Sequence, residues 1–134
     1  MVVISKVKAV NIPPGSSVRV FELRLERFYI TDLLYNGNNY VGEGTHKVRF
    51  DIYSQPGALY PVRHIGFGEY DGSRAIALYG DGWVTPYISA TDFGTLLSRL
   101  RVVVPEGIFT VTYVNGGSNS ATLPQFIALY GYYV

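Results

Sequence analysis

The hydrophobic and polar residues of this chain alternate over short stretches, a pattern typical of strands with one covered face. The alternation is clearest in residues 18–26 and 47–53, where charged residues take turns with valine, leucine, phenylalanine or isoleucine. A period of two places successive side chains on opposite faces of a sheet. The phase slips by one residue at Phe21, which predicts a β-bulge or a bend near that position.

Proline and glycine divide the chain into segments at regular intervals. Corners at 13–15, 56–57 and 105–107 contain Pro and Gly, and Asn36-Gly37 and Asp81-Gly82 are dipeptides typical of tight turns. Strands are therefore expected in residues 2–11, 18–30, 47–53, 58–65, 76–79, 83–88, 100–104, 108–114 and 124–134. Residues 100–104 are apolar enough to predict a strand covered on both faces.

One short helix of about one turn is expected in residues 91–97. Ser89 precedes Asp92 by three residues, which is the spacing of a hydroxyl cap and a carboxylate at a helix start. With about eight or nine strands and at most this one helix, the pattern predicts an all-β fold, an antiparallel β-sandwich of jelly-roll type. A small two-fold β-barrel is the alternative. Residues 1–134 are expected to form one domain, with an N-terminal arm in 1–14.

The sequence Ile-Ala-Leu-Tyr-Gly occurs twice, at residues 76–80 and 127–131. Each copy follows a proline-glycine corner and an apolar run at a similar distance, which predicts an internal repeat of about 47–80 and 97–131. The alternative is coincidence, because β-rich sequences reuse isoleucine, leucine, tyrosine and glycine.

The composition narrows the function classes. The chain has 134 residues, 48% of them hydrophobic, and a net charge of +1, which excludes a disordered chain and argues against nucleic-acid binding through bulk charge. There is no cysteine, so disulfides, thiolate metal sites and cysteine nucleophiles are excluded. The N-terminus lacks the pattern of a secretory signal, and no apolar run is long enough for a membrane-spanning helix, so we expect a soluble protein made in the cytosol.

Catalytic residues and cofactors are not predicted. His46 and His64 have no further ligands at metal-binding spacing and are expected to be surface or cross-strand residues. The Gly-x-Ser-x-Gly signature of a nucleophile is absent. We therefore expect a protein that is not an enzyme and that carries no metal.

Two kinds of binding surface remain open. The chain has 12 tyrosines, which suit half-buried strand faces and subunit interfaces. Its C-terminal strand stays apolar to the last residue, which predicts a subunit interface formed by Tyr130, Tyr132, Tyr133 and Val134 together with Val3 and Val7 of the N-terminal arm. A carbohydrate site is the alternative, with sugar rings stacking on Trp83, Tyr79 and Tyr87 beside Asp81.

A cysteine-free, tyrosine-rich β-sandwich of this size, with an apolar N-terminal arm and an aromatic C-terminal end, resembles the single jelly-roll structural proteins of virus particles, which are capsid or decoration subunits. The resemblance implies assembly in the host cytosol into a virion, with copies of the same chain and other structural proteins as partners. The chain has no basic arm, which argues against direct contact with nucleic acid. The absence of cysteine and the single methionine also suit a protein from a hot habitat.

Overall fold

The computed structural model describes residues 1–36, 44–71, 74–80, 83–91, 95–120 and 124–134, with residues 44–45, 67–98 and 124 described by their backbone within those ranges. The strands are β1 (Val2–Ala9), β2 (Ser17–Asn36), β3 (Gly44–Tyr53), β4 (Arg63–Asp71), β5 (Arg74–Gly80), β6 (Trp83–Thr91), β7 (Thr95–Gly117) and β8 (Pro124–Tyr133).

The predicted all-β, antiparallel fold is confirmed. Every strand pair is antiparallel. Hydrogen bonds join the strands into one sheet with the order β1-β8-β2-β7-β3-β4-β5, and β6 pairs with β7. The described residues contain no helix, and hence none that could cross a membrane.

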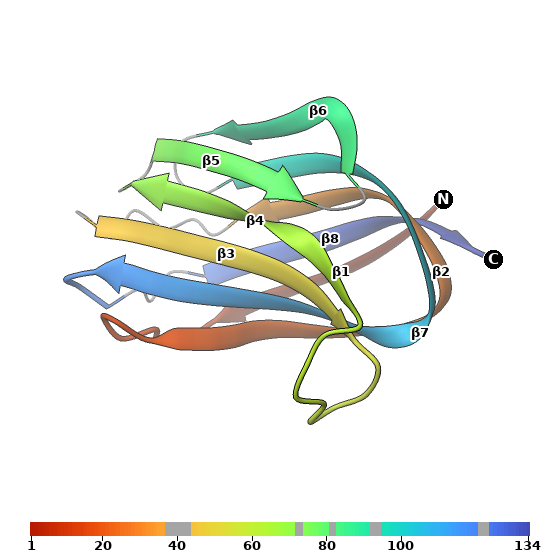
Figure 1. The fold of residues 1–134 in the computed structure, drawn as a ribbon, viewed down its shortest axis with the longest axis horizontal. Helices are drawn as coiled ribbons and strands as arrows, with labels where there is room; N and C mark the ends of the chain where they lie inside the picture. Colours follow the sequence, from red (N-terminus) through yellow and green to blue (C-terminus); the bar gives the residue numbers. More distant parts are fainter. Residues whose placement is uncertain (37–43, 72–73, 81–82, 92–94, 121–123) are drawn as a thin grey trace.

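Two long strands connect the two layers of this sheet. β2 has 20 residues and β7 has 23, and they pair with each other along most of their length. Both turn sharply at the right of Figure 1, so that one half of each strand lies in a front layer with β3 and β4 and the other half lies behind, with β8 and β1. Arg27, with φ of 49°, lies between Glu26 and Phe28 at this bend. The sheet therefore folds over itself while β2 and β7 stay paired on both sides of the bend, at Glu26 with Glu106 and at Phe28 with Val104.

The core fills the space between the layers. Tyr35 on the rear half of β2 packs edge-on against Phe50 of β3, with ring centroids 5.8 Å apart, although these two segments are not neighbours in the sheet. The Tyr35 hydroxyl is buried and donates a hydrogen bond to Gln125 Oε1 at 2.6 Å. Phe109 lies on the other side of Phe50 at 6.2 Å. Alternate residues of the strands thus supply one shared apolar interior.

Several local predictions are tested by the strand register. The slip at Phe21 is confirmed, because the pairing of β2 with β7 shifts between Arg19 and Phe21. The predicted helix at 91–97 is wrong for the residues that the structure describes, because Thr91 pairs with Thr95 and Ala90 with Leu96 as the last pairs of a β6–β7 hairpin. Residues 92–94 lie outside the described residues. Cross-strand pairing satisfies the backbone groups that a turn of helix would have left open at its ends.

The predicted strand at 58–65 is wrong in its first half, because β4 begins only at Arg63. Residues 54–62 form a loop in which Leu59, Tyr60 and Val62 are exposed. Pro56 and Pro61 bracket this segment and cannot donate to a strand ladder. The tight turn expected at Asn36-Gly37 falls on residues 37–43, which lie outside the described residues. The described parts of β2 and β3 on either side of it both pair with β7 and not with each other.

The N-terminal arm forms β1, which pairs with β8 from Val2↔Gly131 to Ala9↔Pro124. The two copies of Ile-Ala-Leu-Tyr-Gly lie in β5 and β8. β5 is the last strand of the order at one end, whereas β8 lies between β1 and β2. The internal repeat stays a prediction.

Candidate functional site

The strand register gathers apolar side chains on the outward side of the rear layer. Val3 of β1 lies opposite Tyr130 of β8, Tyr132 of β8 lies opposite Tyr29 of β2, and Tyr29 lies opposite Val103 of β7. Directly opposed residues in an antiparallel pair share one face of the sheet. We call the following set the outer apolar face: Val3, Val7, Tyr29, Val103, Tyr130 and Tyr132.

The residues next to these in sequence point the other way and are covered. Ile4 packs against the core, and Leu129, Ile30, Val102 and Val104 are buried in it. On the outer apolar face, by contrast, Val7 is 69% exposed, Val3 51%, Val103 50% and Tyr132 48%. Tyr29 and Tyr130 are half-buried between them. A run of apolar side chains that crosses four strands while facing water marks a surface suited to a partner.

Polar groups lie at the margin of the outer apolar face. Arg99 and Arg101 of β7 are exposed, and because they lie two and four residues before Val103 they are on the same face of the strand. The Arg99 guanidinium Nε lies 3.7 Å from Asp32 Oδ1 of β2. Apolar residues inside a margin of charged residues are the usual arrangement of a protein interface.

Four of the six predicted interface residues, Val3, Val7, Tyr130 and Tyr132, therefore lie on one face. The other two, Tyr133 and Val134, lie at the bend. The Tyr133 ring packs edge-on against Phe28 at 5.4 Å, and the Val134 N–H donates to the carbonyl oxygen of Arg27 at 2.7 Å. Both side chains are nevertheless largely exposed. They extend the apolar surface around the end of the sheet.

The sequence did not predict that Tyr29 and Val103 belong to an exposed apolar surface. The signal for Val103 was present, because the apolar run 100–104 predicts a strand covered on both faces. In the structure Val102 and Val104 are covered by the core and Val103 is not. The uncovered side of this run is thus part of the outer apolar face.

The carbohydrate alternative lies on another part of the sheet. Tyr79 is in β5, and Trp83 and Tyr87 are in β6. Asp81 lies outside the described residues, and β5 and β6 are described by their backbone. A carbohydrate site stays a prediction.

A cluster of polar side chains is built around Asp51 of β3. Its buried carboxylate lies 2.8 Å from Arg49 Nε and 2.7 Å from His64 Nδ1, both on partly exposed side chains. These groups border a surface hollow of about 470 Å³ together with Tyr53, Leu59 and Pro61. Within that lining there is no serine, threonine or cysteine to act as a nucleophile. The contacts join β3 to the start of β4 beyond the exposed loop, which is a structural role.

The second histidine, His46, does not lie at the surface. His46 is buried at the end of β3, with its ring centroid 6.0 Å from that of Tyr113. It is therefore a core residue, whereas His64 is a partly exposed cross-strand residue opposite Asp51. Among the residues that the structure describes, no group of three or more His, Asp or Glu side chains is placed to hold a metal ion.

Comparison with known proteins gives little beyond this geometry. No protein-family model matches the chain, and no curated protein matches it. One solved structure, that of infectious bursal disease virus Gx strain, contains a chain with 12% sequence identity and a TM-score of 0.33 over 95% of this chain. This chain spans 31% of the length of that viral chain.

Proposed function

We propose that the chain is a self-assembling structural subunit that forms symmetric homo-oligomers through its outer apolar face and the adjoining edge of β1. The observation that carries the proposal is the continuous row of Val3, Tyr130, Tyr132, Tyr29 and Val103 across four strands. Covering such a row contributes about 25 cal/mol for each Å² of apolar surface removed from water. A second copy of the chain offers the same row, so that a two-fold axis would cover both at once.

The chemistry of this face suits a protein partner. Tyrosine is enriched at interfaces because its ring is apolar while its hydroxyl accepts a polar environment. Three of the residues on the face are tyrosines, and the charged Arg99 and Arg101 lie at its margin, where water remains available. In such an oligomer the partner subunit would cover Val103, so that residues 100–104 would be covered on both faces, as their composition predicts.

We further propose that the oligomers are part of a virus particle. A capsid or decoration protein of a virion, assembled in the host cytoplasm from copies of this chain and other structural proteins, matches the resemblance of the sequence pattern to single jelly-roll subunits. The jelly-roll arrangement of the two layers belongs to this proposal. The function proposed is structural and not enzymatic.

Val103→Glu tests the interface. We expect the unmodified chain to sediment as an oligomer and Val103→Glu to weaken self-association about tenfold or more, because a carboxylate on the covered face would have to lose its water. Circular dichroism should be unchanged, since Val103 is on the surface. Sedimentation velocity over a concentration series measures the effect.

Val62→Glu is the matched control, because Val62 is 64% exposed in the β3–β4 loop, away from the outer apolar face. It should associate like the unmodified chain. A strictly monomeric unmodified chain at high concentration would overturn the proposal, as would equal weakening by the two substitutions.

A further inference from the structure

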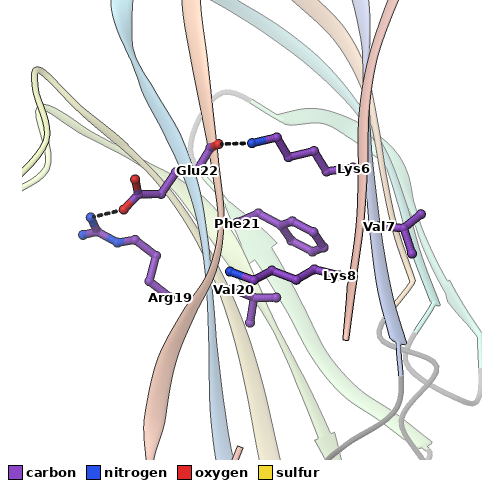
Figure 2. Close-up of a pocket in the computed structure, with 7 residues that line it drawn as sticks. All are labelled: Lys6, Val7, Lys8, Arg19, Val20, Phe21 and Glu22. Atoms are coloured by element: carbon purple, nitrogen blue, oxygen red, sulfur yellow. Dashed lines mark hydrogen bonds and ion pairs between the residues drawn. The ribbon is translucent and has the colours of Figure 1, made fainter. Parts of the chain in front are cut away.

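Two unpaired strand edges face each other at one side of the fold. β1 is the last strand of the order and, among the residues that the structure describes, pairs with β8 alone. β2 pairs with β7 from Ser17 onward but with β8 only from Phe28, so that its front half pairs on one side only within the described residues. A groove of about 370 Å³ lies between these edges, bordered by Lys6, Val7, Lys8, Arg19, Val20, Phe21 and Glu22. Figure 2 shows β1 on one side of the groove and β2 on the other.

The backbone of β2 offers hydrogen-bonding groups to this groove. The Glu22 carbonyl oxygen accepts a hydrogen bond from Lys6 Nζ at 3.1 Å, which shows that this carbonyl points towards β1 (Figure 2). In an antiparallel sheet such a carbonyl normally accepts from the N–H of a neighbouring strand. Residues two apart in a strand point the same way, so Arg24 presents its backbone groups to the same side. The Lys6 ammonium thus occupies the place of a missing strand's N–H.

The charge in the groove is positive. Lys6 and Lys8 extend from β1 towards β2, whereas Val7 points away (Figure 2). The Glu22 carboxylate is on the outer side of β2, where Arg19 Nη1 lies 3.2 Å from it. Lys8 forms no ion pair among the described residues. Two ammonium groups on alternate positions of β1 therefore face a strand edge without a carboxylate between them.

We infer that this groove binds an extended acidic segment of a partner protein by strand addition to β2. The segment would hydrogen-bond to the backbone groups that Glu22 and Arg24 turn towards the groove and displace Lys6 from the Glu22 carbonyl. Carboxylates on alternate residues of the segment would then face Lys6 and Lys8, because side chains on one face of a strand recur every second residue. Affinity comes from the backbone pairing and selectivity from the two ammonium groups.

A second copy of this chain does not supply that segment. Carboxylates at alternate positions occur in it only at Glu69 and Asp71. Both lie in β4, which already pairs with β3 on one side and β5 on the other. The partner is therefore a different protein. Val7 borders both sites, but its side chain points away from the groove and towards the outer apolar face.

A fluorescein-labelled peptide of alternating threonine and glutamate is the probe, with a threonine-lysine peptide as its charge control. In a buffer of physiological ionic strength, fluorescence anisotropy should show binding of the acidic peptide and none of the basic one. Lys8→Glu should lower the affinity about tenfold or more, because attraction at close range becomes repulsion. Lys47→Glu is the matched control, an exposed lysine on β3 that makes the same change of charge outside the groove, and it should bind normally.

Hydrogen exchange separates strand addition from general attraction of charge. On binding, the amides of Glu22 and Arg24 should exchange more slowly, whereas soluble polyglutamate binding without such protection would overturn the inference. Equal weakening by Lys8→Glu and Lys47→Glu, or failure of the acidic peptide to bind, would also overturn it. Loss of self-association in Val103→Glu should leave peptide binding intact, so the two proposals fail independently.

Discussion

Replacing Gly131 by alanine is expected to lower the free energy of unfolding by about 3 kcal/mol or more. A Cβ at this position would overlap the backbone carbonyl oxygen of Tyr29, and it would lie 2.9 Å from the Tyr29 carbonyl carbon and 3.0 Å from the Phe28 ring. The obstacle is the backbone of a paired strand, which cannot rotate away as a side chain can. β8 and β2 must therefore separate locally to admit one methyl group.

The close approach has a local cause. Gly131 lies opposite Ile30, next to the register shift between Ile30 and Asp32 on β2. At such an irregularity the bulged strand bends and its twist increases, which changes the spacing of the paired backbones. The glycine that ends the second Ile-Ala-Leu-Tyr-Gly thus allows β8 to pass the bend of β2.

Urea unfolding followed by circular dichroism measures this loss. Gly57→Ala is the control, because Gly57 has φ of +80° and open space around it. That substitution should lower the free energy of unfolding by only about 1–2 kcal/mol, the cost of placing an alanine in a left-handed backbone conformation. If Gly131→Ala proved no more destabilising than Gly57→Ala, the tight strand contact would be refuted.

Asn115→Ala should destabilise the protein by about 3 kcal/mol, since it removes three hydrogen bonds and leaves buried backbone groups without a partner. The Asn115 amide donates to the carbonyl oxygens of Ile12 at 2.9 Å and Asn119 at 2.8 Å, and its Oδ1 accepts from the Gly117 N–H at 2.9 Å. The bond to Ile12 holds the β1–β2 connection against β7, and the other two join Asn115 to the end of β7 and the residues that follow it.

The backbone of the same residue completes the attachment. The Asn115 N–H donates to the Ser16 carbonyl at 2.9 Å, and its carbonyl accepts from the Gly15 N–H at 2.7 Å. Ile12 is fully buried as a result, although it lies in a connection with corner residues on either side.

Asn119→Ala is the matched control for Asn115→Ala. Asn119 is exposed and contributes its backbone carbonyl to the bond with Asn115, so its side chain should be dispensable within about 0.5 kcal/mol. Thermal and urea unfolding of both variants give the comparison. Equal stabilities would show that the backbone bonds and the apolar contacts hold the connection without the Asn115 side chain.

The period-two pattern was sufficient to predict the strand class, because alternation is a local property of the sequence. It located β1 and the bulge at Phe21. It failed at residues 91–97, where a capping-like spacing predicted a helix but the pairing of Thr91 with Thr95 forms a hairpin. Long-range pairing outweighed the local signal there. It also failed at Leu59, Tyr60 and Val62, since apolar letters alone do not separate a covered strand from an exposed loop.

The candidate site was predictable only in part. Val3, Val7, Tyr130 and Tyr132 were expected from the apolar ends of the chain, but nothing local links Tyr29 to Val103. Their position beside one another depends on the register of β2 with β7. The groove between β1 and β2 could likewise not be predicted from the sequence, because Lys6 contacts the Glu22 carbonyl only when the sheet has folded over.

The pairing of β1 with β8 has a consequence for how the chain folds. β1 takes as its partner a strand that lies far away in the sequence, with Val2 opposite Gly131. Closing so long a loop is slow, and β1 must wait for β8 before its backbone groups are paired. During that interval the backbone of β1 is open, and Lys6 and Lys8 keep one such strand from joining another.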